Sequence, residues 1–178
     1  MRTVATFNDL NTKLGLLRIR PAIEKDAHRV YSVLKNIADW LDRENYGQWI
    51  PGVHDHNIEY ITQLVCNGTC YVVENNGEII GTVQVTWTLP NYWKQESVNV
   101  GYISTLYVHR DLAGHDIGAS ILRWSEDWIR LQKKTFACLH CYAQNLKLCR
   151  YYERHGYEYI DRVETYPDYT QFLYQKRL

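Results

Sequence analysis

The hydrophobic and polar positions in the first third of the chain follow two different periods. Residues 16–21 alternate in the way that predicts a half-buried strand. Across residues 24–45 the apolar side chains recur at helical spacing and acidic residues lie near the start, which predicts an amphipathic helix. A loop at 46–55 is rich in aromatic residues and turn formers, and residues 56–68 then predict a second helix that ends at Gly68.

The rest of the chain predicts further strands and two more helices. Segments 70–74 and 78–89 are rich in Val, Ile, Thr and aromatic residues, and Asn75-Asn76-Gly77 between them is a strong hairpin signal. An exposed connection at 90–97 leads to the last predicted elements. These are a strand at 98–108, a helix at 117–132, a strand at 136–142, a helix at 145–155, and closing strands at 157–163 and 169–176.

The predicted order of elements is β-α-α-β-β-β-α-β-α-β-β. Some strands follow one another by a hairpin and others are separated by helices, which predicts an α/β fold with a mixed sheet and helices on its faces. The 178 residues suffice for one domain with a proper core. We therefore expect an N-terminal extension at residues 1–15 and a single domain at residues 16–178.

Composition and charge exclude several classes of partner. Lys plus Arg and Asp plus Glu number 20 each, so we expect neither nucleic acid nor an anionic membrane as the main partner. Residues 1–15 lack the apolar core of a signal peptide, and no apolar run approaches the ~20 residues that span a bilayer. These features predict a cytoplasmic protein.

The five cysteines are expected to be free thiols, because their number is odd and no signal peptide precedes them. Cys138 and Cys141 have the spacing of a metal or redox pair, but they lie within a predicted strand rather than at a turn. Buried structural thiols are favoured over a metal site, and His140 between them does not change that balance. His54, Asp55 and His56 form an exposed loop cluster, and we expect no metal there.

Two segments carry candidate chemistry. The first runs from a strand through a glycine-containing loop into a helix, so that Gly114 and Gly118 let backbone amides approach an anion at the helix start. An ordinary connection between strand and helix is the alternative for this segment taken alone. The second places Asn145 at a helix start, a pair of tyrosines within the helix and Gly156 at its end.

In this order and spacing the two segments resemble the GNAT superfamily of acyl-CoA-dependent N-acyltransferases. Residues 108–118 (VHRDLAGHDIG) follow the family's phosphate-loop pattern V-x-P-x-x-(Arg or Gln)-G-x-G-x-(Gly or Ala). The later helix matches N-x-x-A-x-x-x-Y-E-x-x-G-(Phe or Tyr), with Leu148 in place of Ala. The matching residues there are Asn145, Tyr152, Glu153, Gly156 and Tyr157. The resemblance extends over residues 16–176.

The resemblance implies a sheet splayed open between the strands 98–108 and 136–142, with acetyl-CoA as co-substrate in the cleft. It places the pantetheine arm along the main chain of residues 106–108, Asn145 near the thiol end, and Tyr152 as the acid that protonates the leaving thiolate. The pyrophosphate would be held by backbone amides of the loop. The residues implied in cofactor binding, besides Asn145 and Tyr152, are Leu106, Tyr107, Val108, Ala113, Gly114, His115, Asp116, Ile117, Gly118 and Ala119.

Three positions depart from the family pattern. His109-Arg110 replaces x-Pro, so the start of the loop is expected to be less rigid, and Ala113 replaces an Arg or Gln that would contact phosphate. Asp116 replaces Gly and puts a carboxylate beside the phosphate site. We expect its side chain to point away from the pyrophosphate, either capping the helix or solvated.

The sequence offers several candidates for the base that takes a proton from the attacking amine. Many relatives place a Glu on the strand before the phosphate loop, and here Tyr102 takes that position with Ser104 on the same strand face. Glu96, or a water held by Ser104, is the alternative base. Tyr102 also fits the role of a half-buried strand aromatic.

The acceptor site is expected between the loop after the first helix and the 90–97 connection. Aromatic side chains there could stack on a planar or cationic acceptor, although burial in the core is an equal alternative. The candidates are Trp49, Tyr46, Trp87 and Trp93, together with Tyr92.

These inferences predict an N-acetyltransferase that transfers an acetyl group to a primary amine of a small molecule by direct attack. A protein N-acetyltransferase and a non-catalytic acyl-CoA-binding module are the alternatives, and retention of Tyr152 argues against the second of them. The expected partner is a small-molecule amine, and the chain allows a homodimer.

Overall fold

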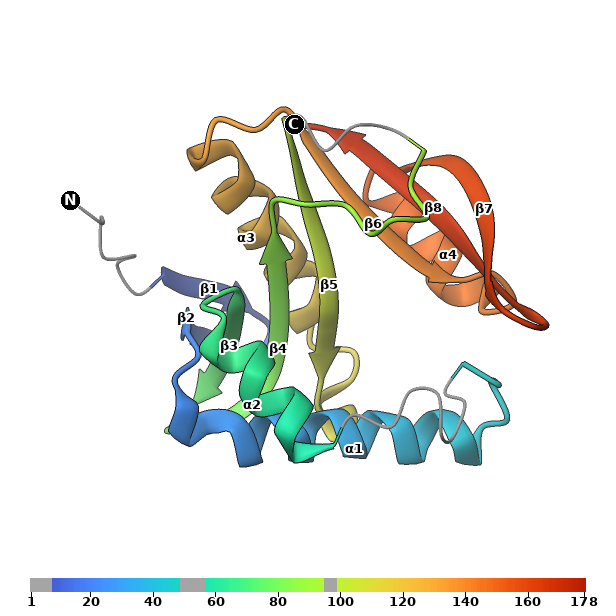
Figure 1. Ribbon diagram of the computed structural model, residues 1–178. Helices are drawn as coiled ribbons and strands as arrows, with labels where there is room; N and C mark the ends of the chain where they lie inside the picture. Colours follow the sequence, from blue (N-terminus) through green and yellow to red (C-terminus); the bar gives the residue numbers. More distant parts are fainter. Residues whose placement is uncertain (1–7, 49–56, 95–98) are drawn as a thin grey trace.

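The computed structural model describes residues 8–48, 57–94 and 99–178. Its strands and helices follow the predicted order with one strand added at the start (Figure 1). The strands are β1 (Asn8–Thr12), β2 (Gly15–Pro21), β3 (Cys70–Asn75), β4 (Glu78–Thr86), β5 (Val100–Val108), β6 (Phe136–Tyr142), β7 (Glu158–Tyr166) and β8 (Tyr169–Arg177). The helices are α1 (Ala27–Arg43), α2 (Ile58–Cys66), α3 (Ile117–Leu131) and α4 (Leu146–Arg154), with 3-10 turns at Glu24–Asp26 and Arg110–Leu112.

The strands form one mixed sheet in the order β1-β2-β3-β4-β5-β6-β8-β7, which confirms the predicted α/β class. Every neighbouring pair is antiparallel except β5 and β6, which run parallel. That parallel pairing covers only residues 100–102 against 136–138. Beyond it the two strands diverge, so the sheet opens into a V whose apex is the short paired stretch (Figure 1).

A bulge in β5 increases its bend along the open part. Tyr107 is opposite Thr82 and Ser104 is opposite Gln84, so that Val83 faces two residues of β5 rather than one. Thr105, within this extra-residue stretch, adopts a left-handed backbone with φ of 51°. The bulge lies directly before the predicted phosphate loop and turns the end of β5 toward the start of α3.

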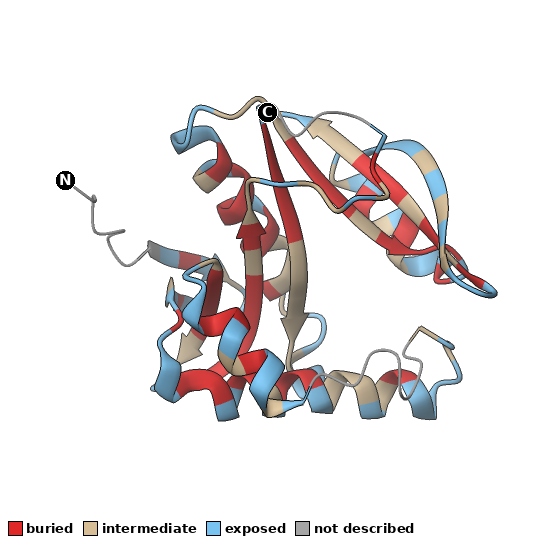
Figure 2. Ribbon diagram, in the orientation of Figure 1, coloured by how far each residue is buried: buried red, intermediate tan, exposed pale blue. Residues whose placement is uncertain are grey.

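The helices cover both faces of the sheet, and the core lies in two layers. The larger cluster packs α3 and α4 against one face, and a second packs α1 and α2 against the other. Figure 2 shows the buried residues concentrated along the central strands and the inward sides of α1 and α3. The contact of β5 with α3 is close, since a Cβ built on Gly101 would lie 2.4 Å from Cγ1 of the buried Ile129.

Strand β1 lies in the segment assigned to an extension by sequence. It pairs antiparallel with β2, and Leu10 is buried in the larger core cluster. The hairpin also contacts the start of α3, because Ser120 Oγ donates to the Asn11 carbonyl at 2.7 Å and the Lys13 amide donates to the His115 carbonyl at 3.2 Å. This strand therefore supports the loop that precedes α3.

The cysteines are free thiols, as predicted. Cys66 is exposed, whereas Cys138 and Cys141 are buried in the core together with Cys70 and Cys149. Across residues 8–48, 57–94 and 99–178, no group of three or more His, Cys, Asp or Glu side chains is arranged to hold a metal ion. In the same ranges no helix combines the length and apolarity that crossing a bilayer requires.

Candidate active site

The loop from β5 to α3 presents a run of unused backbone donors. The first bond of α3 joins the Ser120 amide to the Asp116 carbonyl, so the amides before it have no partner inside the helix. In the described part of the chain, none of the amides of residues 114–119 donates a hydrogen bond. The Ala113 amide donates to the Arg110 carbonyl at 3.0 Å, so the run begins one residue later than the resemblance implied. Six successive donors at a helix N-terminus form an anion site.

The backbone of this loop curves around open space. Gly114 has φ of 84°, and a Cβ built on it would meet no atom within 4 Å. Asp116 also takes a left-handed conformation, with φ of 60°. Left-handed residues among right-handed ones turn consecutive N–H groups toward one point, which suits a phosphate group.

Arg110 fastens the start of the loop to α1. Its amide donates to Oδ1 of Asn36 at 3.0 Å, and its guanidinium lies over the Trp40 ring, 3.9 Å from the centroid. The His109-Arg110 pair, which sequence reasoning expected to leave this end of the loop less rigid, is therefore tied to a helix by two contacts.

Asp116 is solvated but does not cap α3. Its side chain makes no capping hydrogen bond. Instead Oδ2 lies 3.0 Å from Nζ of Lys13, with the two side chains 54% and 65% exposed. The capping alternative is therefore wrong, because the left-handed backbone and the nearby lysine direct the carboxylate elsewhere. Lys13 offsets the negative charge that Asp116 brings to the phosphate loop.

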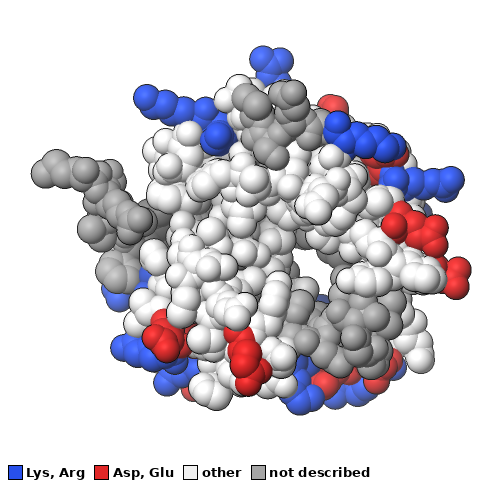
Figure 3. Space-filling view, viewed as in Figure 1, with Lys and Arg blue, Asp and Glu red and all other residues white. Residues whose placement is uncertain are grey.

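The open edge of β5 forms one wall of the cleft. In the described part of the chain, β6 pairs with β5 only at residues 100–102 and diverges from it along residues 103–108. Leu106 and Val108 pack partly buried against the larger core cluster, and Tyr107 points to the opposite face, where burial raises its pKa to about 12. Figure 3 shows a hollow between the halves of the molecule, bordered among the described atoms mostly by residues without charge.

Tyr152 lies on α4, on the far side of the V from α3. The ring is buried, and burial raises the pKa of its hydroxyl far above the ordinary value for tyrosine. Among the described residues none forms a hydrogen bond with this hydroxyl. A phenol that stays protonated and is not committed to a protein partner is able to donate a proton.

Asn145 is more fully engaged than the resemblance implied. Its Oδ1 accepts from the Leu148 amide at 3.1 Å, which caps α4, and its Nδ2 donates to Oε1 of Gln48 at 2.7 Å. Tyr169 Oη donates to the Gln48 carbonyl at 2.7 Å. The segment after α1 is thereby joined to both the α4 start and β8, and it closes one end of the cleft.

Tyr102 and Ser104 share a strand face but have different partners. Tyr102 is buried, and its hydroxyl hydrogen-bonds Nδ1 of His140 and lies 3.2 Å from Oη of Tyr92. Ser104 Oγ donates to Oε1 of Gln84 at 3.1 Å. Burial raises the pKa of Tyr102 well above its ordinary value, so its hydroxyl is protonated and cannot itself be the base.

Of the predicted acceptor aromatics, those in the described part of the chain lie in different places. Trp93 is buried and packs edge-on against Tyr102, whereas Trp87 packs against the larger core cluster on the α3 face. Tyr46 is half-buried beside Trp40, with ring centroids 5.3 Å apart. For Trp93 and Trp87 these positions favour the core alternative. Trp49, Glu96 and the cluster of His54, Asp55 and His56 lie outside the described residues.

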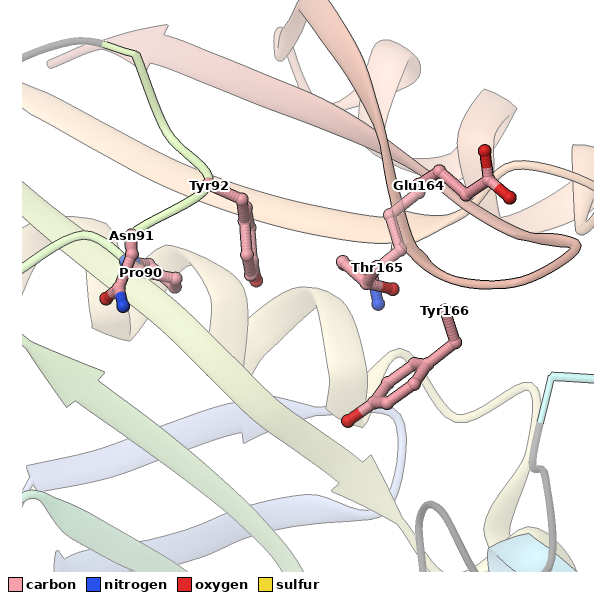
Figure 4. Close-up of a pocket in the computed structure, with 7 residues that line it drawn as sticks. Pro90, Asn91, Tyr92, Glu164, Thr165 and Tyr166 are labelled. Atoms are coloured by element: carbon pink, nitrogen blue, oxygen red, sulfur yellow. The ribbon is translucent and has the colours of Figure 1, made fainter.

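A pocket of about 720 Å³ opens beside Tyr92, between the segment after β4 and the end of the β7–β8 hairpin. In Figure 4 the Tyr92 and Tyr166 side chains reach into this space, and the Glu164 carboxylate points away from it. The buried Gln171 also lines the pocket, and its Oε1 has no hydrogen-bond partner in the described chain. The lining residues are Pro90, Asn91, Tyr92, Glu164, Thr165, Tyr166 and Gln171.

Sequence reasoning missed most of this pocket. Only Tyr92 was named as a candidate. Gln171 was read simply as part of a strand, and Tyr166 lay between the two predicted closing strands. His140 was considered only as a possible metal ligand beside Cys138 and Cys141. Strand alternation places His140 on the face of Cys138, but its contact with Tyr102 depends on the parallel register of β5 and β6, which no local signal reveals.

The phosphate loop, the splayed sheet and the buried tyrosine on α4 define an acyltransferase site. The family model "Acetyltransferase (GNAT) family" matches residues 34–157, and the chain belongs to this family of N-acetyltransferases. An uncharacterized N-acetyltransferase of Bacillus subtilis, YesJ, is 30% identical over 149 residues, which cover 79% of this chain and 81% of that protein.

Solved structures share the fold at lower identity. A GNAT-family acetyltransferase from Listeria monocytogenes has a TM-score of 0.82 and 20% identity, covering 96% of this chain and 100% of that one. The PaiA N-acetyltransferase of Thermoplasma acidophilum, solved with coenzyme A, has a TM-score of 0.73 and 14% identity over 91% and 99% of the two chains. YncA of Salmonella typhimurium, a putative acetyltransferase solved with acetyl-CoA, has a TM-score of 0.69 and 16% identity over 91% and 94%.

Proposed function

We propose that this enzyme transfers the acetyl group of acetyl-CoA to a primary amine of a small molecule, with the amine attacking the thioester directly. The observation that carries the proposal is the run of six unused amides at residues 114–119, which follows directly on the stretch of β5 that diverges from β6. The T. acidophilum and S. typhimurium proteins of the same fold were solved with coenzyme A and acetyl-CoA.

The loop and the cleft fit the parts of acetyl-CoA in sequence. The amides of residues 114–119 suit the pyrophosphate. The main chain at Leu106 and Val108, where β5 has diverged from β6, suits the amide-bearing pantetheine arm, which adds like a strand. We expect that arm to direct the thioester toward the apex of the V, with Tyr152 on α4 as the acid. Asn145 reaches the cofactor only by exchanging its bond to Gln48.

The acceptor pocket favours a small amine. Its volume of about 720 Å³ suits a small molecule, within the ordinary range of ~300–1,000 Å³ for ligand sites. Tyr92 and Tyr166 supply aromatic walls. The unpartnered Oε1 of Gln171 is a buried acceptor that needs a donor, and an amine N–H supplies one.

In direct attack, Tyr152 is the general acid that protonates the leaving thiolate. The amine nitrogen adds to the thioester carbonyl, the C–S bond breaks, and the departing thiolate takes the proton of the Tyr152 hydroxyl. The raised pKa keeps that hydroxyl protonated at neutral pH, so it can donate to the sulfur as negative charge develops there. Ser104 remains a candidate for holding a water near the attacking amine.

The test uses acetyl-CoA with a panel of primary amines: a polyamine, an amino acid and an aminoglycoside. Free thiol and N-acetylated amine should form in equal amounts. Tyr152→Phe keeps the ring and should lower turnover roughly 10²-fold with little change in acetyl-CoA affinity. Tyr157→Phe is the matched control, since its ring lies in the same core, 6.0 Å from that of Tyr152, and it should retain turnover. Equal turnover in the two variants would return Tyr152 to a packing role.

The remaining expectations stay predictions. They are a cytoplasmic location, independence from metal ions, and no nucleic acid or membrane partner. A homodimer is also consistent with the fold, and sedimentation of the purified chain would test it.

A further inference from the structure

Three rings from three different segments meet at the apex of the V. Tyr92 precedes β5, Tyr102 lies on β5 and His140 lies on β6. Nδ1 of His140 is their common point, because it hydrogen-bonds the Tyr102 hydroxyl and lies 3.4 Å from Oη of Tyr92. The rings of Tyr102 and His140 are stacked at 16°, with centroids 5.8 Å apart. The interaction fixes the imidazole and both hydroxyls in one hydrogen-bonded group.

This group joins the acceptor pocket to the point where the sheet opens. Tyr102 with Cys138 is the last of the three parallel pairs, and His140 follows two residues later on the same face of β6. At the other end of the group, Tyr92 lines the pocket and its side chain points into it (Figure 4).

We infer that His140 is the proton acceptor of acetyl transfer, and that it receives the proton from the attacking amine through the hydroxyls of Tyr92 and Tyr102. The inference rests on the proposed function. Because His140 acts through the tyrosines, it is a positioning residue and the terminus of a relay rather than a group that touches the acceptor.

The proton balance of the relay is simple. As the N–C bond forms, the amine passes a proton to Tyr92 Oη, Tyr92 passes its own to Tyr102 Oη, and Tyr102 passes its own to Nδ1 of His140. The imidazole, which we assign as carrying its proton on Nε2, becomes an imidazolium and then loses one proton to solvent. The thiolate meanwhile takes the proton of Tyr152, and Tyr152 then regains a proton from solvent. One proton is thus released and one taken up, and the products are the N-acetyl amine and free thiol.

Only the imidazole of this group is a base near neutral pH. Burial raises the pKa of both Tyr92 and Tyr102, so both hydroxyls are protonated at neutral pH. Each can therefore pass a proton on only by donating its own as it accepts another. Among the described residues, the other titratable groups that the strand register places on this face are the Cys138 thiol, the Glu158 carboxylate and the ion pair between Lys94 and Asp161, whose Nζ and Oδ2 atoms are 2.6 Å apart. Leu173 on β8 is the direct neighbour of His140 and carries no charge.

The relay predicts a specific pH dependence. Below the pKa of His140 the imidazole is already protonated and cannot accept, so kcat/KM should fall tenfold per pH unit on the acidic side. His140→Gln keeps a hydrogen-bonding side chain without a base. It should lower kcat/KM at neutral pH roughly 10²-fold and abolish this dependence on the imidazole, with acetyl-CoA affinity unchanged.

The experiment measures thiol release against pH for the wild type, His140→Gln and Tyr92→Phe, using the amine of the panel that is acetylated fastest. His28→Gln, an exposed histidine on α1, is the matched control and should keep the wild-type profile. Tyr92→Phe removes one half-buried hydroxyl, so it interrupts the relay without a buried change, and it should also slow transfer. Should His140→Gln fail to fold, this variant alone decides.

Unchanged turnover and an unchanged acidic limb in His140→Gln, or unchanged turnover in Tyr92→Phe, would overturn the relay while the wild type remained active. A wild type that binds acetyl-CoA and releases no thiol with any amine would instead overturn the proposed function, and the relay with it. The two failures are therefore distinguishable.

Discussion

Replacing Asp116 with Asn removes a negative charge from the lip of the phosphate loop without changing its backbone. Asn tolerates the left-handed conformation at φ of 60° at least as well as Asp does. Because the structure shows no capping bond from Asp116, none is lost. The substitution therefore tests electrostatics alone.

The magnitude follows from the charges around the loop. A carboxylate ~6 Å from a phosphate repels it by roughly 3 kcal/mol at an effective dielectric of ~20. Lys13 Nζ, 3.0 Å from the carboxylate, cancels much of this, and the 54% exposure of Asp116 admits solvent screening. We expect Asp116→Asn to tighten acetyl-CoA binding by about 0.5 kcal/mol, roughly twofold, at low salt. Lys13→Gln leaves the carboxylate uncompensated and should weaken binding by about twofold to fivefold.

Calorimetry of the two single variants and the double variant at about 0.02 M and about 0.5 M salt gives the measurement. The double variant should bind close to the wild type, and all differences should shrink at high salt. Weaker binding by Asp116→Asn would show that the carboxylate makes a favourable contact with the cofactor and would refute this reasoning.

Asp116→Gly tests whether the left-handed backbone at residue 116 lowers the stability of the protein. If Asp116 capped α3, this change would lower the stability of the protein without cofactor. Since the cap is absent and glycine adopts the left-handed region freely, we now expect stability to be unchanged or raised by up to ~1 kcal/mol. Urea unfolding of the apo protein measures it, and a clear loss of stability would contradict the observed backbone.

Three further predictions concern the core and the pocket. Gly101→Ala should lower the free energy of unfolding by about 1–3 kcal/mol in urea, because its Cβ would lie 2.4 Å from Ile129 Cγ1. The double variant Gly101→Ala with Ile129→Ala should lose less stability than the two single variants added together, since the smaller side chain removes the clash. Burial alone would raise the pKa of Asp26, but its bonds from Arg20 and the Ile23 amide lower it overall. Asp26 therefore contributes stability above its unfolded-state pKa of ~3.9 that is lost as pH falls through the lower folded value, and Asp26→Asn should flatten the acid side of a curve of unfolding midpoint against pH. Gln171→Leu should raise the acceptor KM and leave acetyl-CoA affinity alone, whereas Trp93→Ala should instead cost ~3–5 kcal/mol of stability.

The elements with strong periodicity were predictable from sequence. The apolar spacing of α1 and the turn at Asn75-Asn76-Gly77 are signals carried by residues close together in the sequence. The structure shows the helix and the hairpin that they predicted. Strand β1 was missed because residues 8–12 (NDLNT) contain one apolar side chain, Leu10, and become a strand only by pairing with β2. The bulge at Thr105 likewise arises from tertiary pairing rather than local preference.

In the candidate site, too, only the residues that belong to continuous sequence motifs could be predicted. The phosphate loop and Tyr152 belong to continuous motifs, so their positions could be predicted. The pocket joins a segment before β5 to the end of β7 and to β8, and the contact of His140 with Tyr102 requires the parallel register of β5 and β6. Such neighbours are set by sheet topology, which the order of residues does not specify locally.

Acetyl transfer itself is the most direct test of the account. The purified chain is incubated with acetyl-CoA and the panel of small primary amines, and free thiol and N-acetylated product are measured together. The account predicts both in equal amounts with at least one amine, and a loss of roughly 10²-fold in Tyr152→Phe. Acetyl-CoA binding without thiol release from any small amine would contradict it.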